Sequence, residues 1–209
     1  MSTKLESISP SDIEARNFQI IESELKSKLN PRLAPIITRV IYNTGDFDYA
    51  DCLSFSRGVV QKAERALQDG VSILTDTSMT RAGINRKALS AFGAEVFCFM
   101  SDEDVARAAR LSDTTRAAAC IDKAARLDRE FIFVIGNSPT ALVRLHRLIK
   151  EEKIPKPPLI IGVPAGFVNV SQAKELVTKC GVPYIISRGQ KGGCNVAAAI
   201  CNALIYGIK

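Results

Sequence analysis

Residues 131–140 read FIFVIGNSPT. The first five are apolar and β-branched or aromatic, which predicts a buried strand over Phe131–Ile135. Ser138 and Pro139 then give the start signal of a helix, a capping side chain followed by proline at the first helical position. The turn Gly136-Asn137 is compatible with a ligand contact through its N–H groups but does not require one. A buried strand that runs directly into a helix is typical of an α/β protein.

The same order of strand and helix repeats along residues 71–209. β-rich runs lie at Val71–Thr75, Glu95–Phe99, Phe131–Ile135, Leu159–Val163 and Tyr184–Ser187. Helix-like stretches lie between and after them, at Thr77–Phe92, Asp102–Leu127, Pro139–Glu152, Ser171–Cys180 and Cys194–Ile205. Because strands that alternate with helices form βαβ units, we expect a mainly parallel sheet covered on both faces. The predicted fold class is α/β, a flavodoxin-like, doubly wound sheet of five strands whose order the sequence leaves open.

The first 70 residues have a helical pattern instead. Helices are predicted at Pro10–Leu29, from Pro31 to near Tyr42, and from about Asp48 to Leu67. The first has a start signal, since Ser11 can cap it and Glu14 follows three residues later. We expect residues 1–70 to be a mainly helical extension on a βαβ core of residues 71–209, together one domain of residues 1–209.

Size and composition are those of a water-soluble protein. The chain has 209 residues, of which 46% are hydrophobic and 24% charged, and no apolar run reaches the roughly 18 residues that a membrane span needs. The first residues are polar and contain no visible signal peptide, so the cytoplasm is the expected compartment. Six scattered cysteines without a Cys-x-x-Cys pair predict reduced core thiols and no metal site. His146, the single histidine, falls in mid-helix and is expected to be a solvated surface residue.

The chain carries 28 Lys and Arg against 22 Asp and Glu, a net charge of +6. This balance favours an anionic partner, which is a nucleic acid, a membrane surface or an acidic small molecule. The basic residues are dispersed, and only 6% of the residues are aromatic, with no Trp. Nucleic acid is the weakest of the three, because its binding sites combine a basic stripe with stacking side chains.

Four predicted strand ends carry unusual residues, and in doubly wound sheets the ligand lies beyond these ends. They are Leu74–Thr77 (LTDT), Gly136–Thr140 (GNSPT), Gly162–Phe167 (GVPAGF) and Arg188–Gly193 (RGQKGG). The last is the best anion site, because glycines let N–H groups turn inward and Arg188 and Lys191 add charge. A tight strand-to-helix turn with solvated cations explains it equally well. Phe167 either offers an apolar wall to a flat ligand or anchors its loop in the core.

Arg116 falls in the first turn of a predicted helix, where a cation is usually unfavourable. That position indicates a partner for the guanidinium group. The partner is either a ligand or the neighbouring carboxylate of Asp113.

Five segments in order resemble the blocks of the precorrin-8X methylmutase family. They are Ile13–Phe18 (IEARNF), Thr44–Ala50 (TGDFDYA), Ile135–Leu142 (IGNSPTAL), Val163–Val168 (VPAGFV) and Arg188–Gly193 (RGQKGG). The resemblance extends from about Ser9 to Tyr206, nearly the whole chain. Each block alone is short, but five in order at the family's spacing make a specific match.

The resemblance implies a homodimeric, flavodoxin-like isomerase of cobalamin (corrin) biosynthesis. Such an enzyme moves a methyl group from C-11 to C-12 of (cobalt-)precorrin-8, a tetrapyrrole polycarboxylate, and yields cobyrinic or hydrogenobyrinic acid. The shift needs no nucleophile and no redox cofactor, and any cobalt is carried by the substrate. The protein's task is to bind and distort the macrocycle and to control the protonation of a ring nitrogen.

The resemblance also implies site residues. Tyr42 stands at the position of the family's catalytic histidine, and Asn17 replaces a serine that contacts the substrate. Together with Asp76 at its strand end and Arg116 at its helix start, the predicted substrate-binding residues are Asn17, Thr44, Asp76, Arg116, Asn137, Gly166, Phe167, Arg188, Lys191 and Gly192. Arg116, Arg188 and Lys191 are the expected clamps for substrate carboxylates.

Tyr42 leaves three interpretations open, because a phenol with a pKa of about 10 is a far weaker acid than imidazolium. Tyr42 donates a hydrogen bond that drives the same shift, or another group supplies the proton. The third interpretation is a diverged, non-catalytic corrinoid-binding or carrier protein. A different class, a nucleotide-binding flavodoxin-like protein, would bind FMN or phosphate at the turn of residues 188–193 instead.

Overall fold

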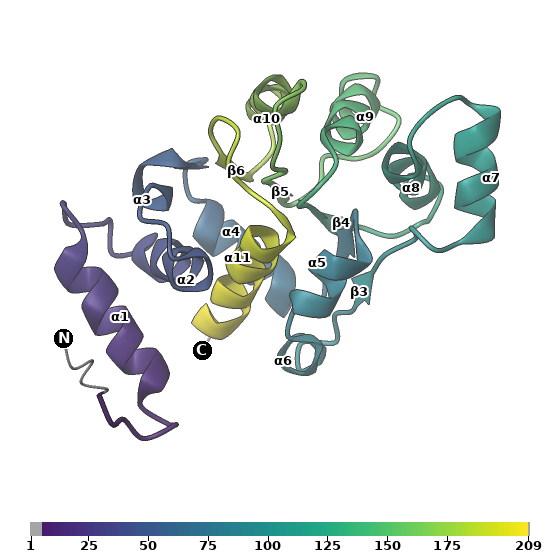
Figure 1. The fold of residues 1–209 in the computed structure, drawn as a ribbon. Helices are drawn as coiled ribbons and strands as arrows, with labels where there is room; N and C mark the ends of the chain where they lie inside the picture. Colours follow the sequence, from purple (N-terminus) through teal and green to yellow (C-terminus); the bar gives the residue numbers. More distant parts are fainter. Residues whose placement is uncertain (1–5, 209) are drawn as a thin grey trace.

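Six strands form one sheet in the computed structural model, which describes residues 6–208 (Figure 1). They are β1 (Leu53–Phe55), β2 (Ser72–Thr75), β3 (Val96–Phe97), β4 (Phe131–Ile135), β5 (Ile160–Gly162) and β6 (Tyr184–Ser187). Their order across the sheet is β1-β6-β5-β4-β2-β3. Strands β2 to β6 are parallel, and β1 runs antiparallel to β6 with Leu53 opposite Ser187. The mainly parallel α/β sheet predicted from the sequence is confirmed.

The strand order identifies the place where the winding of the sheet reverses. Counted along the chain among themselves, the five parallel strands lie in the order 2-1-3-4-5, one of the common doubly wound orders. The reversal falls between β2 and β4, which pair from Ser72 opposite Phe131 to Thr75 opposite Val134. Ligands of such sheets lie outside the carboxyl ends of the two strands at the reversal. The topology therefore predicts a site beyond Thr75 and Ile135.

Eleven helices accompany the sheet in the described chain. They are α1 (Ile13–Glu24), α2 (Ala34–Thr44), α3 (Tyr49–Cys52), α4 (Val59–Gln68), α5 (Ser78–Gly83), α6 (Arg86–Ser90), α7 (Glu103–Leu111), α8 (Arg116–Ala124), α9 (Pro139–Lys150), α10 (Val170–Thr178) and α11 (Cys194–Gly207). Alternate residues of β4 face opposite cores, Ile132 toward α2, α4 and α11, and Phe133 toward α7 to α10. No helix between residues 6 and 208 has the length and hydrophobicity needed to cross a membrane.

The predicted helix from Asp48 to Leu67 is wrong, because this segment contains β1. Helix α3 ends at Cys52, the chain extends over Leu53–Phe55, and α4 begins after Gly58. Gly58 adopts φ 69°, a left-handed conformation that glycine reaches at little cost. Pairing with the edge of β6 stabilises three residues that are too few to show a strand pattern of their own. The sheet therefore has six strands instead of the five predicted.

Two other predicted helices are each divided in two. Thr77–Phe92 contains α5 and α6, and Asp102–Leu127 contains α7 and α8. The second division falls at Asp113, which has φ 46°. Thr115 then caps α8 by accepting from the N–H of Ala118 at 3.2 Å. The division makes Arg116 the first residue of a helix.

The N-terminal helices pack on the C-terminal helix. α11 lies against both α2 and the sheet, and nine of its residues are buried. α1 packs on α2 and is the outermost helix at this end of the molecule (Figure 1). Ile21 is the buried residue of α1. The helical extension therefore reaches the core in two steps, since α1 packs on α2 and α2 packs on α11.

Candidate functional site

The four strand ends singled out in the sequence meet at one edge of the sheet. Asp76, after β2, accepts hydrogen bonds from the turn after β4. The N–H of Gly193 donates to the carbonyl oxygen of Val163 at 2.8 Å, and the N–H of Gly166 donates to that of Gln190 at 3.0 Å. We call this edge, formed by residues 75–77, 136–140, 163–167 and 188–193, the carboxyl rim. It lies on the side where the strand order predicts a ligand.

Asp76 is buried where the winding reverses, with 1% of its surface exposed. Its Oδ1 accepts from the N–H of Gly136 at 2.9 Å, and its Oδ2 accepts from those of Asn137 and Ser138 at 2.9 and 2.7 Å. Burial raises the pKa of Asp76, and the three N–H donors act in the opposite direction. Because the carboxylate already holds these N–H groups, they are not free for an anion. Asp76 orders the turn that presents the exposed side chain of Asn137.

Residues 188–193 form the glycine turn between β6 and α11. Gly189 adopts φ 72°, and a Cβ at Gly192 would overlap the carbonyl oxygen of Val163. The N–H of Gly193 is bonded to the same oxygen, so it is not open to a phosphate. This geometry weakens the nucleotide-binding interpretation. Arg188 is exposed, with its Nη2 3.4 Å from Oγ of Ser54 on β1.

Lys191 joins the glycine turn to the segment after α2. Its Nζ donates to Oδ2 of Asp46 and to Oδ2 of Asp48, both at 2.6 Å. Hydrogen bonds to Asp46 and Asp48 raise the pKa of Lys191, and Lys191 lowers the pKa of Asp46. Lys191 is predicted from the sequence as a clamp for a substrate carboxylate. In the structure its ammonium group holds two carboxylates of the chain itself.

Lys174 on α10 was not predicted as a site residue. Its side chain is 1% exposed, and its Nζ donates to the carbonyl oxygens of Gly189 at 2.9 Å and Lys191 at 2.7 Å. Burial lowers the pKa of Lys174 to about 8. The sequence does contain a signal, because Lys174 lies four residues after Val170 and three before Val177, on the apolar face of the helix. A lysine on such a face indicates a buried partner.

Tyr42, the predicted catalytic residue, lies near the end of α2 and faces α1. Its ring packs edge to face on Phe18, with the centroids 5.7 Å apart, and 37% of the residue is exposed. The guanidinium group of Arg39 lies 5.2 Å from the centroid of the same Phe18 ring. The phenol is thus held in place and still open to solvent.

Asn17 lies on α1, the helix that Tyr42 faces, and Thr44 lies on α2, the helix that contains Tyr42. Asn17 of α1 is half-buried, and its Nδ2 donates to a carbonyl oxygen one turn earlier at 2.7 Å. Thr44 ends α2, and its Oγ1 accepts from the N–H of Asp46 at 3.3 Å. Because Lys191 ties Asp46 to the glycine turn, Thr44 is joined to the carboxyl rim.

Arg116 lies beside the turn after β4. Thr115, which caps α8, shares a hydrogen bond of 2.6 Å with Thr140 at the start of α9, so the two helix starts are adjacent. Arg116 is exposed, and no salt bridge between residues 6 and 208 includes it. Asp113, proposed from the sequence as its partner, does not fill that role. The guanidinium group is therefore free for an anionic ligand.

Phe167 stands out from the rim after β5. It is 82% exposed and Val168 is 78% exposed, so the interpretation of Phe167 as a buried anchor is wrong. Gly166, with φ 145°, places it there, and the N–H of Gly166 is held by Gln190 of the glycine turn. A groove with Thr140 and Val168 in its lining runs alongside, between α8, α9 and this loop.

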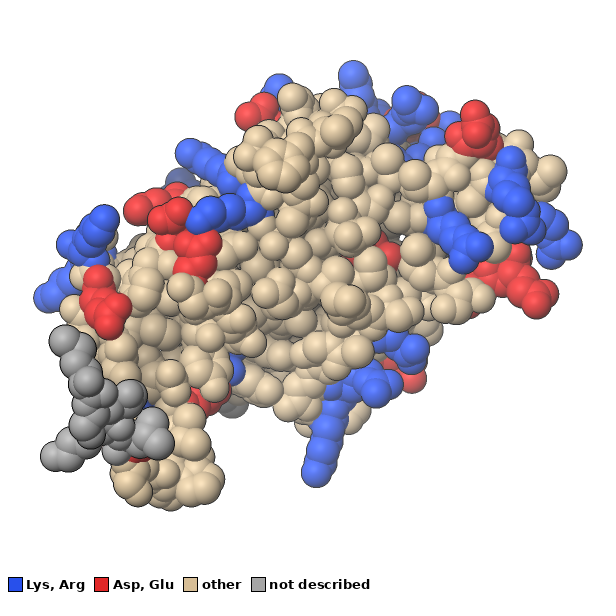
Figure 2. Space-filling view, in the orientation of Figure 1, with Lys and Arg blue, Asp and Glu red and all other residues tan. Residues whose placement is uncertain are grey.

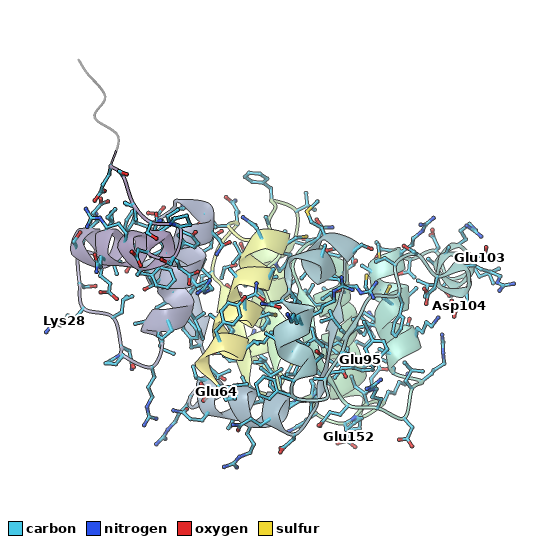
Figure 3. The ribbon with its side chains drawn as sticks, turned by 90° about the horizontal axis from the view of Figure 1, so that it is seen from below. Lys28, Glu64, Glu95, Glu103, Asp104 and Glu152 are labelled. Carbon is cyan, nitrogen blue, oxygen red and sulfur yellow. The ribbon has the colours of Figure 1, made fainter. Side chains whose placement is uncertain are left out.

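Charges are unevenly distributed over the surface. In the view of Figure 2, the middle of the molecule has few charged side chains, and both the basic and the acidic side chains gather toward its margins. Glu95, before β3, and Glu152, after α9, belong to the opposite edge of the sheet, and Figure 3 shows both on the same side of the molecule.

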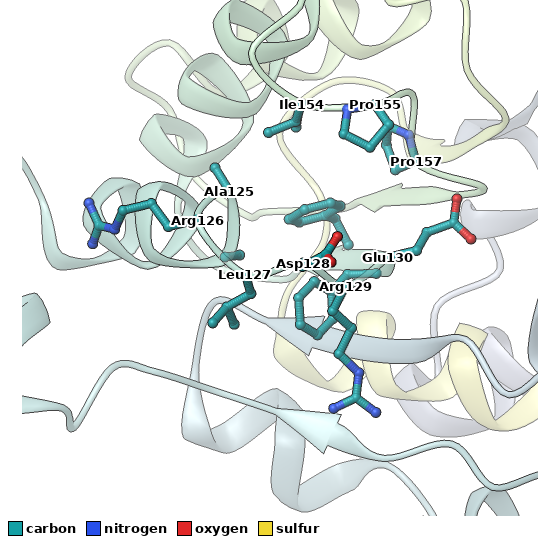
Figure 4. Close-up of a pocket in the computed structure, with 12 residues that line it drawn as sticks. Ala125, Arg126, Leu127, Asp128, Arg129, Glu130, Ile154, Pro155 and Pro157 are labelled. Carbon is teal, nitrogen blue, oxygen red and sulfur yellow. The ribbon is translucent and has the colours of Figure 1, made fainter.

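A cavity opens at that opposite edge, near the start of β4 (Figure 4). Its lining includes Arg126, Leu127, Asp128, Arg129, Glu130, Ile154, Pro155 and Pro157. None of the site residues predicted from the sequence lines it. We therefore place the candidate site at the carboxyl rim and not in this cavity.

The cysteines and the histidine give no catalytic pair or metal centre. Between residues 6 and 208, no group of three or more His, Cys, Asp or Glu side chains is arranged to hold a metal ion. His146 is half-buried, with Nδ1 3.3 Å from Sγ of Cys180, so it is less solvated than predicted. Burial raises the pKa of Cys180 to about 11, which keeps the thiol protonated and unreactive near neutral pH.

Comparisons with known proteins identify the family to which the chain is similar. Residues 12–207 match the family model described as Precorrin-8X methylmutase. The Cobalt-precorrin-8 methylmutase of Salmonella typhimurium is 40% identical, over 96% of this chain and 96% of the relative. That of Leptospira interrogans is 37% identical, over 93% of this chain and 92% of the relative. The crystal structure of the precorrin-8X methylmutase of Thermus thermophilus has a TM-score of 0.83 and 35% identity, covering 93% of this chain and 96% of the other.

Proposed function

The chain belongs to the precorrin-8X methylmutase family, and from this we propose that its carboxyl rim binds the macrocycle of (cobalt-)precorrin-8. The protein is an isomerase of cobalamin biosynthesis, a methylmutase. In our proposal it moves one methyl group from C-11 to C-12 of the ring and yields cobyrinic or hydrogenobyrinic acid. Since the methyl group stays within one molecule, the residues of the chain need only bind, orient and hold a proton.

One observation carries this proposal, which is the meeting of separate segments at one rim. The end of α2 reaches the glycine turn through Asp46 and Lys191, and the turn after β5 reaches it through Gly166 and Gln190. The view in Figure 2 adds a weakly charged middle with Lys and Arg, as well as Asp and Glu, around it. A flat macrocycle with carboxylates at its periphery suits such a surface.

The exposed residues of the rim are the ones we assign to substrate contact. Arg116 and Arg188 bind peripheral carboxylates, for which the guanidinium fork is suited. Phe167 lies against the face of the ring. Asn137, Asn17 and Thr44 offer hydrogen bonds to the side chains of the substrate. Lys191, Asp76, Gly166 and Gly192 shape the rim through contacts within the chain.

Tyr42 is our candidate for the group that faces the reacting part of the ring. Its phenol is held by Phe18 and is open to solvent. A phenol donates a hydrogen bond to a ring nitrogen but is a weaker acid than imidazolium. We therefore expect Tyr42 to assist the shift less strongly than a histidine would.

We further infer that the chain is a single flavodoxin-like domain of residues 1–209 that acts as a cytoplasmic homodimer and needs no protein-bound metal. The strand order supports the flavodoxin-like assignment. The exposed apolar pair Phe167 and Val168 supports a surface that is covered, either by the macrocycle or by a second copy. Sedimentation at several protein concentrations tests the dimer.

Incubation with precorrin-8, with and without cobalt, tests the proposed function. We expect the visible spectrum to change as the product forms, and the rate to fall in Tyr42→Phe. In Tyr42→His the rate should rise about tenfold or more, because a general acid typically contributes roughly 100- to 10,000-fold. Tyr184→Phe, at the other end of β6, is the matched control. Absence of conversion by the native chain and by Tyr42→His would contradict the proposal.

The absence of the family's histidine favours one second candidate, a non-catalytic corrinoid carrier. This alternative predicts that cobyrinic acid binds tightly while precorrin-8 remains unconverted. Titration of both compounds, followed by their absorbance, separates the two functions.

A further inference from the structure

Lys174 is buried at the base of the carboxyl rim, away from the solvent that normally surrounds an ammonium group. Its exposed fraction is 1%, and it belongs with Ile and Leu residues among the largest fully buried side chains. Removing an ammonium group from water is costly, and an apolar residue at this helix position would avoid that cost. Val170, Ala173 and Val177, on the same face of α10, are all apolar and buried.

The partners of Lys174 are neutral. Its Nζ donates to the carbonyl oxygens of Gly189 and Lys191, which flank Gln190 at the tip of the glycine turn. No salt bridge in the described part of the chain includes Lys174. The hydroxyl of Ser187 donates to the same Lys191 oxygen at 2.7 Å. The buried ammonium group therefore binds only the backbone of this turn among the described residues.

From these contacts we propose that Lys174 is a positioning residue for the substrate. By fixing the backbone of residues 189–191, it holds Arg188, the Lys191 link to the end of α2, and the turn that bears Phe167 in one arrangement. Lys174 itself touches no ligand. The proposal rests on the proposed function, because it assigns the rim to the macrocycle.

Three contacts connect the glycine turn, which Lys174 holds, to neighbouring segments of the rim. The side chain of Lys191 holds Asp46 and Asp48, one turn beyond Tyr42. The carbonyl oxygen of Gln190 accepts from the N–H of Gly166, next to Phe167. The N–H of Arg188 donates to the carbonyl oxygen of Cys52 at 2.7 Å, which ties the start of the turn to α3.

The surroundings of Lys174 make its hydrogen bonds to the glycine turn sensitive to pH. Cys52, from α3, is the titratable group that acts on it, and burial raises the pKa of the Cys52 thiol, which stays neutral. Lys191 lies in the turn itself and is paired with Asp46 and Asp48. With a pKa of about 8, Lys174 loses its charge in mildly alkaline solution. A neutral amine donates weaker hydrogen bonds than an ammonium group, so the contacts of Lys174 with Gly189 and Lys191 weaken above this pH, although the cost of burying the charge is also removed.

Kinetics of Lys174→Met and Lys174→Gln against Lys179→Met test the proposal. Lys179 is the exposed lysine at the end of the same helix and serves as the matched control. We expect KM for precorrin-8 to rise roughly tenfold to hundredfold in both Lys174 variants, with a smaller change in kcat, because hydrogen bonds of a charged group are lost. In the native chain KM should rise above pH 8 with the loss of one proton, and this step should disappear in Lys174→Met.

Hydrogen exchange separates this proposal from the proposed function. In Lys174→Met we expect faster exchange at the amides of Gly166 and Gly193 at pH 7, and no change in Lys179→Met. If neither the native chain nor Tyr42→His converts precorrin-8, the proposed function fails, and the affinity for cobyrinic acid replaces KM in the same comparison. Unchanged exchange, or faster exchange with unaltered KM or affinity, would overturn the positioning role. If neither Lys174 variant folds, a native KM that shows no step near pH 8 overturns it as well.

Discussion

The carboxylate of Asp76 shows how a single side chain sets the shape of a turn. It is 1% exposed and accepts from three consecutive N–H groups after β4. In Asp76→Asn an amide NH2 replaces one acceptor oxygen, so one buried N–H loses its partner. We expect the free energy of unfolding to fall by about 1–3 kcal/mol in urea denaturation. Asp69→Asn, at an exposed position after α4, is the control. An equal loss of stability there would argue against a special role of the Asp76 hydrogen bonds.

Lys174 makes the stability of the fold depend on pH. Burial lowers the pKa of Lys174 to about 8 from its ordinary value of 10.5. Between these values the unfolded chain binds a proton that the folded chain has released, so the free energy of unfolding rises with pH in this window. For a shift of this size the full gain is about 3 kcal/mol.

The measurement is urea denaturation from pH 7.5 to 10.5 of the native chain and of Lys174→Met. Other groups titrate equally in both proteins, so the difference between them isolates Lys174. We expect the native chain to gain stability relative to the variant as the pH rises. Parallel curves would show that the folded chain does not depress the pKa of this lysine.

Residue roles were partly predictable from the sequence. The positions of Arg188 and Phe167 at the rim follow from where the strands end, but the sequence left open whether Phe167 is exposed or buried. The roles of Asp76 and Lys191 did not follow, because each is fixed by partners distant in sequence, at residues 136–138 and 46–48. Lys174 was missed although its place on an apolar helix face signals burial.

At the scale of elements, Lys191 connects the glycine turn to the segment after α2. Its ion pairs with Asp46 and Asp48 are solvent-exposed, and such pairs contribute about 0–1 kcal/mol to stability. We therefore expect Lys191→Met to unfold at nearly the native urea concentration while KM for precorrin-8 rises several-fold. The rise follows because the end of α2 and the turn are no longer held together.

Combined substitutions test whether Lys191 acts through Asp46 and Asp48. Asp46→Asn combined with Asp48→Asn should raise KM as much as Lys191→Met, and adding Lys191→Met should cause no further rise. Lys153→Met, which removes an exposed pair with Glu151, is the matched control. Additive effects would mean that Lys191 contacts the substrate directly.

Elements were predicted where their signal is local. All five parallel strands were found, because buried strands of this kind are continuous apolar runs. Strand β1 was missed, since three residues carry no pattern and only pairing with β6 extends them. The division between α7 and α8 was missed because Asp113, a non-glycine residue, adopts φ 46°.

At the scale of the whole molecule, the order of elements made the site predictable. Alternation of strands and helices implies a parallel sheet, and the ends of parallel strands share one edge. Contacts across that edge then join the glycine turn to the segment after α2 and to the turn after β5. The packing of α2 on α11 could not be predicted from the sequence, because it depends on which apolar helix faces contact each other in the folded chain.

The net charge of +6 acts on the substrate over distances longer than any single contact. Figure 2 shows Lys and Arg at the margins of the surface together with Asp and Glu, so the attraction rests on the excess of cations over the whole chain, and Figure 3 shows Glu95 and Glu152 at the other edge of the sheet. Such a field attracts a polycarboxylate, and salt screens it, since the Debye length falls from about 10 Å at 0.1 M to about 3 Å at 1 M.

We therefore expect kcat/KM for precorrin-8 to fall several-fold between 0.05 and about 0.5 M salt, while kcat changes little, because screening weakens encounter and not the methyl shift. Binding of a fully esterified, uncharged cobyrinic acid is the control and should stay nearly constant over the same range. Arg116→Gln and Arg188→Gln should each flatten the salt dependence, because each removes one cation that we assign to a peripheral carboxylate. A native kcat/KM that is indifferent to salt would mean that the macrocycle is held through its apolar face, by Phe167 and its neighbours, and not through its carboxylates.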